Sequence, residues 1–353
     1  MFRNALVVGG AGFVGSNLAI TLKQNVPAGN VQAFDNLHRR GSELTLKRLR
    51  EAGVAFVHGD IRISEDFACF GDLDLIIDCS AEPSVLAGIG GDPSYVIQTN
   101  LFGTFHILEL ARRKNARLVF LSTSRVYPVR HLLNIPLQQT VGRFVLGSPL
   151  PRGLTPEGIT EEFPLDGPRT LYGASKLASE LLIQEYIETY GLKAVINRCG
   201  IITGPWQMGK VDQGVVALWV AHHVFKRPLK TIGFGGQGLQ VRDAIHVDDL
   251  ADLLGIQLSN IDKASGTCFN VGGGHAVSFS LAELTALCEE VTGNRVPMES
   301  VAETRPGDVP YYVTDASLVS RTFGWKPKRD MRAIVAEIAS WIESHRDELK
   351  DIL

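Results

Sequence analysis

The sequence has few cysteines, no long apolar run and no excess of charge of either sign. Its 353 residues include 35 lysines and arginines against 38 aspartates and glutamates, so the formal net charge is −3. This balance argues against a dedicated binder of nucleic acid or of an anionic membrane surface. Hydrophobic residues make up 45% and charged residues 21% of the chain, which is typical of globular proteins and excludes intrinsic disorder.

The five cysteines are an odd number without CxxC spacing. This excludes a small disulfide-rich scaffold and offers no zinc motif, so we expect no metal and a reducing compartment. The longest apolar stretch begins at Val215 and is interrupted by His222 and His223, well short of the roughly 20 residues that a membrane span requires. The N-terminal residues run into a glycine-rich loop without the cleavage site of a signal peptide,. We therefore expect a cytoplasmic protein without membrane contact.

Short apolar runs alternate with longer amphipathic stretches from Met1 to about Val195. This alternation predicts right-handed βαβ units, and hence an α/β fold with a parallel sheet covered by helices on both faces. We expect strands in ALVVGG (5–10), VQAFD (31–35), VAFVHGD (54–60), LDLIIDCS (73–80), RLVFLSTS (117–124) and KAVINR (193–198). We expect helices over 16–24, 44–52, 95–114 and 172–190,.

After Gly200 the pattern changes to Gly- and Pro-rich loops with strand-like and helical pieces between them, and it ends in a polar helix over 331–353. This indicates a smaller, mixed α/β lobe. Residues 246–258 have the pattern of a helix that packs back on the main sheet, so the chain is expected to cross the boundary more than once,. The expected domains are 1–199, rejoined by about 240–266, and a second lobe formed by 200–239 and 267–353.

A glycine-rich loop follows the first predicted strand and opens an amphipathic helix, with glycines at 9, 10, 12 and 15. Such a loop lets the backbone approach a pyrophosphate at the positive end of the helix dipole, although an ordinary tight turn is the alternative. The second predicted strand ends in Asp35, 20 residues after Gly15. Asp35 can accept hydrogen bonds from both hydroxyls of an adenosine ribose and would repel a 2′-phosphate. We therefore predict dinucleotide binding with NAD favoured, while Arg39 and Arg40 leave NADP as an alternative.

The turn after the third predicted strand, from His58 to Ile61, is a further candidate contact. A polar side chain there, Asp60, can meet the adenine edge. A simple strand-terminal turn with a solvated aspartate explains the same residues equally well.

Tyr172 and Lys176 lie four residues apart in YGASK, which places them on one face of the predicted helix,. Taken alone, such a pair is most often a solvated helix face. A neighbouring ammonium and the positive nicotinamide ring both favour the phenolate, so Tyr172 can act as a general base. Ser122, Thr123 and Ser124 end a strand at the edge where open α/β sheets bind ligands. One of these hydroxyls can share the substrate proton, although many such hydroxyls only cap a strand.

These motifs together resemble the extended short-chain dehydrogenase/reductase family over nearly the whole chain: GGAGFVG, Asp35, Asn100 in NLFGTFHILE, LSTSRVY and YGASK. In the second half, GLQVRD at 238–243, IHVDDLA, FNVGGG and Arg305-Pro-Gly-Asp308 resemble the nucleotide-sugar epimerases and dehydratases of that family. The resemblance implies a Rossmann-type doubly wound sheet, NAD as cofactor and a nucleotide-diphosphate sugar as substrate. It also implies a homodimer, formed when the helices over 95–114 and 172–190 of two chains pack into a four-helix bundle.

The resemblance also implies the roles of individual residues. The expected catalytic residues are Tyr172, Lys176 and Thr123. The expected cofactor contacts come from these two helix residues, Tyr172 and Lys176, and from Gly9, Gly12, Phe13, Val14, Gly15, Asp35, Asn36, Asp60, Ile61, Ser80, Ala81, Asn100 and Ser122. The expected substrate contacts come from Ser124, Gln213, Arg242, Arg305 and Asp308. The two arginines would hold the diphosphate, since guanidinium groups match phosphate oxygens; a structural ion pair is the alternative for each.

Within this family several strings are most similar to the CDP-tyvelose (CDP-paratose) 2-epimerases, namely FDNLHRRG, FVHGDIR, VDQG (211–214), GLQVRDAIHVDDL and CFNVGGGHAVSFSLAEL. The 49 positions from Thr123 to Tyr172 (172 − 123) are as long as in those enzymes and longer than in UDP-galactose 4-epimerases. The 4,6-dehydratases carry an Asp-Glu pair where this chain has Ser124 and Arg125, so loss of water lacks its catalysts,. We expect an isomerase for a CDP-sugar. Other nucleotide-sugar epimerases, a net-redox reductase and a catalytically silent nucleotide sensor remain alternatives.

Two segments depart from the family pattern. The family's His-Leu-Ala-Ala after the fourth strand is Asp78-Cys79-Ser80-Ala81 here, and the usual Ser-Pro before the catalytic tyrosine is Thr170-Leu171. In the family these residues face the nicotinamide and the sugar, so the departures leave the identity of the sugar open.

Overall fold

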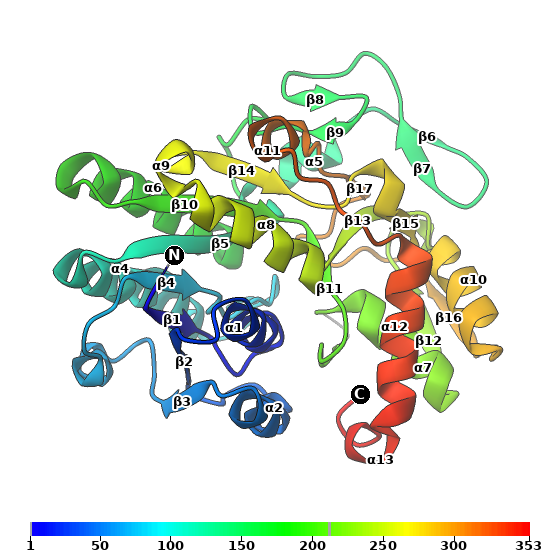
Figure 1. Cartoon of the computed structure of the whole chain (residues 1–353). Helices are drawn as coiled ribbons and strands as arrows, with labels where there is room; N and C mark the ends of the chain where they lie inside the picture. The colour runs from blue at the N-terminus through cyan, green and yellow to red at the C-terminus, as the bar shows by residue number, and fades with distance from the viewer. Residues whose placement is uncertain (1, 211–212) are drawn as a thin grey trace. The chain divides into compact units, whose positions relative to one another are not determined.

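A computed structural model describes residues 2–210 and 213–353 (Figure 1). The chain divides into two units. The first unit comprises Met1–Val126, Leu171–Arg198 and Leu250–Phe269, and the second comprises Tyr127–Thr170, Cys199–Asp249 and Asn270–Leu353. This division groups residues 127–170 with the second unit, whereas the sequence analysis assigned them to the dinucleotide-binding domain.

A seven-stranded sheet in the order β14-β10-β5-β4-β1-β2-β3 forms the centre of the fold. Its strands are β1 (Asn4–Val8), β2 (Asn30–Asp35), β3 (Ala55–His58), β4 (Leu75–Asp78), β5 (Arg117–Thr123), β10 (Ala194–Cys199) and β14 (Cys268–Val271). The pairs β1–β2, β1–β4, β2–β3 and β4–β5 are parallel, which confirms the predicted α/β class with a Rossmann-type sheet. Strand order reverses between β1 and β4, and ligands bind at the carboxyl ends of strands at such a switch point.

The strands of this sheet are apolar on both faces, as expected for a sheet covered by helices. Leu6, Ile76 and Phe120 share a buried cluster with Ile107 and Ile183 of two helices, while the alternate residues such as Ala5 and Val7 are buried as well. The helical segments are α1 (Phe13–Asn25), η1 (Ser42–Leu44), α2 (Thr45–Glu51), η2 (Ser64–Cys69), α3 (Ser94–Ile97), η3 (Gln98–Phe102), α4 (Gly103–Lys114), η4 (Ser124–Val126), α6 (Leu171–Tyr190), α8 (Val247–Ser259) and α9 (Ile261–Ala264).

The helix expected over 95–114 contains a π-helical turn, η3, between α3 and α4. The backbone carbonyl of Asn100 in this turn accepts hydrogen bonds from the hydroxyls of Thr104 and Ser179, at 2.8 and 2.9 Å. Side-chain donors that enter the backbone ladder in this way distort a regular helix.

The second unit contains a four-stranded sheet of β11 (Ile201–Thr203), β13 (Val241–His246), β15 (Ser278–Ser280) and β17 (Tyr311–Tyr312). Three two-stranded sheets accompany it: β6 (Leu137–Gln139) with β7 (Phe144–Leu146), β8 (Leu154–Thr155) with β9 (Gly158–Ile159), and β12 (Leu229–Ile232) with β16 (Met298–Val301). Its helical segments are α5 (Val129–Leu133), α7 (Val215–Phe225), η5 (Phe234–Gly236), η6 (His275–Val277), α10 (Leu281–Thr292), α11 (Ser317–Phe323), α12 (Met331–Ser344) and α13 (Arg346–Leu349).

The final helix, expected over 331–353, ends at Ser344 and is followed by the short α13. His345 leaves the helical region at φ −121°. Its ring contacts the ring of Trp206, with centroids 4.9 Å apart, and its Nδ1 lies 2.9 Å from the carbonyl oxygen of Trp341. These contacts hold His345 in a non-helical conformation, so α12 ends at Ser344.

Across the described residues, none of the helices combines the length and the apolar character that a bilayer crossing requires. All five cysteines are free thiols.

Candidate active site

The loop between β1 and α1 brings backbone amides and a helix N-terminus together at the carboxyl end of the sheet. Gly9 has φ 71°, which favours glycine, and a Cβ there would lie 2.9 Å from the backbone nitrogen of Ser80,. A Cβ at Gly15 would lie 2.1 Å from the carbonyl oxygen of Gly9. Phe13 and Val14 occupy the first turn of α1, whose N–H groups have no partner within the helix,. The bare loop therefore fits a pyrophosphate.

Asp35 ends β2 beside this loop. Its Oδ2 accepts a hydrogen bond from the Ala11 amide at 3.1 Å, and its Oδ1 accepts one from the Leu37 amide at 2.8 Å. Burial raises the pKa of Asp35 even though these backbone hydrogen bonds act in the opposite direction. Each carboxylate oxygen keeps a second lone pair, so the group retains capacity to accept from ribose hydroxyls.

Asp60 follows β3 and is held by an ion pair. Its carboxylate accepts hydrogen bonds from Arg62 at 2.6 and 2.9 Å and from the side-chain amide of Asn36 at 3.0 Å. The Arg62 guanidinium holds the pKa of Asp60 well below its usual range. Ile61 is buried, so Asn36 and Asp60 form the polar part of this turn.

The hydroxyls at the end of β5 have different partners. Ser122 donates a hydrogen bond to the carboxylate of Glu180, which is also bound by Arg198 through contacts of 2.7 to 3.1 Å. The Oγ1 of Thr123 accepts a hydrogen bond from the Arg125 amide at 3.1 Å. Ser124 begins the 3₁₀ turn η4. The Ser122 hydroxyl therefore joins β5 to α6.

Tyr172 and Lys176 lie on α6, one turn apart. Lys176 is only 2% exposed, and its Nζ lies 3.8 Å from the centroid of the Phe120 ring on β5. The hydroxyl of Ser175 donates to the carbonyl of Tyr172 at 2.8 Å, and the Asn100 amide donates to Ser175 at 3.1 Å. Asn100 thus anchors the first turn of α6 to η3.

The segment after β4 contains Ser80 and Ala81. The Ser80 amide and hydroxyl donate to Oδ1 of Asp78, at 2.9 and 2.5 Å. Ala81 is half-buried. The structure thus gathers the predicted cofactor residues of the first unit at the carboxyl ends of β1 to β5 and on the helical segments η3 and α6.

In the second unit, Arg242 on β13 pairs with Asp308, with Nη2 and Oδ1 2.7 Å apart. The Asp308 amide donates to the carbonyl of Arg305 at 3.2 Å, so a tight turn brings the two predicted arginine positions close together. Gln213 exchanges backbone hydrogen bonds with Lys210. The neighbouring residues of the VDQG string, 211 and 212, lie outside the described residues.

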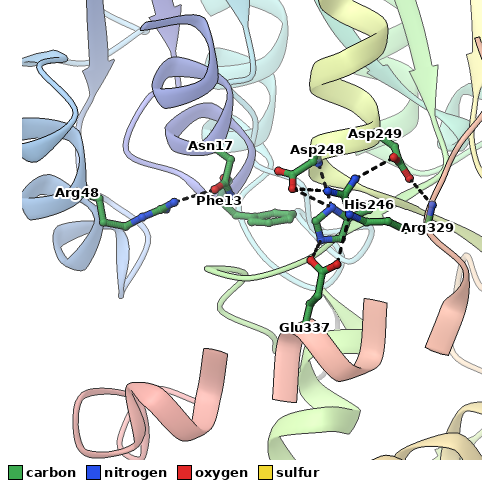
Figure 2. A network of polar contacts seen from close by, with 8 residues as sticks. All are labelled: Phe13, Asn17, Arg48, His246, Asp248, Asp249, Arg329 and Glu337. Carbon is green, nitrogen blue, oxygen red and sulfur yellow. Dashed lines mark hydrogen bonds and ion pairs between the residues drawn. The ribbon is translucent and has the colours of Figure 1, made fainter. Parts of the chain in front are cut away.

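A cluster that the sequence analysis missed surrounds His246 at the end of β13 (Figure 2). His246 Nδ1 accepts a hydrogen bond from the Asp248 amide, so the neutral ring carries its proton on Nε2, which lies 3.2 Å from Glu337,. Burial lowers the pKa of His246, although the Asp248 and Glu337 carboxylates act in the opposite direction. Arg329 contacts Asp248, Asp249 and Glu337 at 3.0 to 3.3 Å.

His246, Asp248 and Glu337 have the donor atoms of a metal site, but the Arg329 guanidinium already supplies a positive charge to both of these carboxylates, as it does to Asp249. We therefore interpret the cluster as a network that fastens α12 to β13. Figure 2 also shows a separate hydrogen bond of 2.9 Å in the first unit, from Arg48 to Asn17 of α1.

The sequence analysis also missed Glu180 and Arg198, which are 1% and 6% exposed. One signal was available, because Glu180 is four residues after Lys176 and therefore on the same face of the helix. Nothing in the sequence marked Arg198 as its partner.

Comparisons with known proteins agree with this arrangement. The model of the NAD dependent epimerase/dehydratase family matches residues 5–272. The chain is 30% identical to CDP-paratose 2-epimerase of Salmonella typhi over 96% of its own length and 99% of that enzyme. It is 28% identical to dTDP-glucose 4,6-dehydratase of Salmonella typhimurium, over 95% and 91% of the two chains.

Solved structures show the same similarity. UDP-glucose 4-epimerase of Thermotoga maritima, solved with UDP-glucose, superposes with a TM-score of 0.78 at 25% identity and covers 97% of this chain and 99% of that one. The dTDP-glucose 4,6-dehydratase DesIV of Streptomyces venezuelae, solved with NAD and TYD, has a TM-score of 0.77 at 27% identity and covers 99% and 100%.

Proposed function

Since this chain belongs to the NAD-dependent epimerase/dehydratase family and NAD is its cofactor, we propose that it is an epimerase for a nucleotide-diphosphate sugar, most specifically a CDP-sugar inverted at C2. The observation that carries the proposal is 30% identity with a CDP-paratose 2-epimerase over nearly the whole of both chains. Ser124 and Arg125 support it against dehydration, because they stand where the 4,6-dehydratases carry their acid pair,.

The first unit supplies the cofactor site in this proposal. The glycine loop and the first turn of α1 bind the pyrophosphate, and Asp35 accepts from the adenosine ribose. Asn36, Asp60 and Ile61 line the adenine side. Ser80, Ala81, Asn100 and Ser122 shape the nicotinamide end, Ser122 and Asn100 through their bonds to α6. Bound there, NAD would supply the acceptor and donor of a hydride.

Tyr172 is the general base that removes the proton from the sugar hydroxyl as the ring carbon is oxidised. The Lys176 ammonium favours the phenolate and holds the nicotinamide ribose. Thr123 shares the proton with Tyr172, and Ser124 contacts the sugar. The oxidised sugar is a transient ketone, and the same phenol returns the proton after the opposite face of the ketone is reduced.

The second unit holds the nucleotide. Arg242 and Arg305 bind the diphosphate, with Asp308 orienting Arg242 through its ion pair,. Gln213 contacts the substrate beside them. A held diphosphate lets the sugar turn over between oxidation and reduction without leaving the enzyme.

We further propose that two copies pair through α4 and α6 in the cytoplasm. Four large apolar side chains on η3, α4 and α6 are 42% to 56% exposed: Phe102, Phe105, Leu181 and Tyr190. An apolar face of this kind on a pair of adjacent helices is suited to a second copy of itself.

The proposal is tested by denaturing the purified protein, identifying the released nucleotide by mass spectrometry, and following native enzyme with CDP-paratose by NMR. We expect NAD(H) and a sugar inverted at C2, without accumulation of free NADH. NADH formed in proportion to product would favour a net-redox enzyme. Turnover of a UDP-hexose instead would move the assignment to a 4-epimerase, and bound NAD(H) without turnover across a nucleotide-sugar panel would favour a silent nucleotide sensor.

A further inference from the structure

A fully buried carboxyl group ends β4 at a position where the resembling enzymes carry histidine. Asp78 is 0% exposed. Its Oδ1 accepts two hydrogen bonds from Ser80, from the amide and from the hydroxyl. Its Oδ2 is buried and has no hydrogen-bond partner among the described residues. A buried carboxylate oxygen without a hydrogen-bond partner lowers the stability of the folded state. A nearby positive charge would offset this loss.

The sheet register places such a charge nearby. Asp78 is the partner of Phe120 across the parallel pair β4–β5, so the two side chains point to the same face of the sheet,. Asp78 also follows Ile76 by two residues, and Ile76 belongs to the cluster that packs against α4 and α6. The ammonium of Lys176 lies over the Phe120 ring. The Asp78 carboxyl and the Lys176 ammonium, which α6 places over Phe120, therefore lie on the same buried face of the sheet.

The electrostatics agree with this geometry. Burial raises the pKa of Asp78, and the Lys176 ammonium is the strongest of the effects that lower it, ahead of the two bonds from Ser80. Lys176 is the charged group with the largest effect on the pKa of Asp78. The next charges on the same face, Glu180 of α6 and Arg198 of β10, are bound to each other.

We propose that Asp78 is a positioning residue that serves as the buried counter-charge of Lys176, keeping the ammonium protonated and in place and acting through it on Tyr172. A buried ammonium is unstable in its charged form unless an anion compensates it. The charge pairing is argued from the sheet register, from the ammonium over the Phe120 ring and from the direction of the Asp78 pKa. Only the last step, the effect on Tyr172, rests on the proposed function.

The ion pair is tested by a double-mutant cycle of Asp78→Asn and Lys176→Met, measured by urea unfolding of the full chain. Asparagine keeps the acceptor for Ser80 and removes the charge. We expect Asp78→Asn to lower the folding equilibrium constant at least about tenfold more when Lys176 is present than when it is methionine. Asp60→Asn combined with Lys176→Met is the matched control and should be additive, since Asp60 pairs with Arg62. Additivity of the Asp78 cycle would overturn the proposal.

The effect on Tyr172 is tested by the pH profile of turnover, which a purely structural role would leave in place. With a less stable ammonium, the acid limb should move to higher pH by about one unit in Asp78→Asn. If the acid limb of the pH profile does not move, or moves to lower pH, Asp78 does not act on Tyr172 through Lys176. If the asparagine variant does not fold, Asp78→His replaces it, since histidine is the residue of the resembling enzymes. The unfolding cycle and the pH profile are then measured at pH values above the pKa of the new histidine, where its ring is neutral. An inactive wild-type enzyme would count against the proposed function, while the cycle would still decide the ion pair.

Discussion

A single phenol carries the proton transfer in the proposed reaction. Tyr172→Phe keeps the ring on α6 and deletes the group that exchanges the proton, so kcat should fall on the order of 10²-fold or more. Steady-state turnover of the nucleotide sugar measures this. Tyr190→Phe, near the other end of the same helix, is the control and should retain activity. A Tyr172→Phe enzyme with undiminished kcat would remove Tyr172 from the role of base.

A second buried carboxyl, Asp243 on β13, links stability to pH. It accepts hydrogen bonds from Thr314 and from the Gly274 amide, yet burial raises its pKa to about 6. The pKa of the same carboxyl in the unfolded chain is near the ordinary aspartate value of 3.8, so the native state binds the proton more tightly. The contribution of Asp243 to stability is therefore present at low pH, is lost as the pH rises from about 4 to about 6, and stays lost above that.

Asparagine at this position does not titrate, so the difference between Asp243→Asn and wild type isolates the effect. The free energy of unfolding of the variant, relative to wild type, should rise by about 2 kcal/mol between about pH 4.5 and about pH 7.5. Urea titrations at both pH values measure it. A difference that does not change with pH would show that Asp243 has an ordinary pKa in the folded protein.

Residues whose roles follow from local spacing could be predicted from the sequence. The glycines of the first loop, Asp35 and the pair Tyr172 and Lys176 each form a pattern within a few residues or at the end of a predicted strand. The partners Asp78 and Lys176 are 98 positions apart (176 − 78), and only the packing of α6 on the sheet joins them. No local pattern carries such a pairing.

At the scale of elements, Arg329 joins α12 to the first turn of α8, because it pairs with Glu337 of α12 and with Asp248 and Asp249 of α8. Arg329→Met should lower the free energy of unfolding by about 2 kcal/mol, because Asp249, which is 1% exposed, loses its cation,. The figure is reduced from that of a fully buried pair because Arg329 is 27% exposed,. Thermal or urea unfolding checks it.

Arg329→Lys is the matched control, because lysine retains the positive charge without the planar guanidinium group. The free energy of unfolding should fall less in this variant than in Arg329→Met. If methionine and lysine destabilise the protein equally, the charge of Arg329 is not what holds α12.

The ends of α2 and α6 were predicted to within one residue, whereas α1, expected over 16–24, begins three residues earlier at Phe13. The π turn at Asn100 and the end of α12 at His345 depend on hydroxyls and rings from elsewhere in the chain. The interruption of these two helices is therefore a tertiary effect, which the helical periodicity of the sequence does not predict.

At the scale of the whole molecule, the apolar face of α4 and α6 predicts self-association. Leu181, 56% exposed, should tolerate burial against a second copy but not a charge there, so Leu181→Glu should shift the protein from dimer to monomer. Sedimentation velocity at several concentrations measures this. Val141→Glu, an equally drastic change at an exposed loop residue outside these helices, should leave the dimer intact. A wild-type monomer at every concentration would remove the proposal.

The division into two units was less accessible from the sequence than the sheet. Residues 127–170 follow the fifth strand directly, and their apolar side chains are interrupted by prolines and glycines without a helical or strand period. In the structure, Leu137, Phe144 and Leu146 pack against Val241, Tyr311 and Val313. The apolar partners of this segment lie roughly a hundred or more positions further along the chain. Its membership of the second unit therefore depends on tertiary contacts, which local sequence patterns do not reveal.

The order of the segments also matters while the chain is being made. The first 126 residues contain β1 to β5, but β10 and β14, which follow β5 in the sheet, are encoded after part of the second unit. A nascent chain that has emerged only to Val126 therefore exposes the apolar edge of β5, and such an edge is a template for association with other chains. The sheet can be completed only after residue 271 has emerged from the ribosome, so we expect a chain that ends before β14 to be prone to aggregation,.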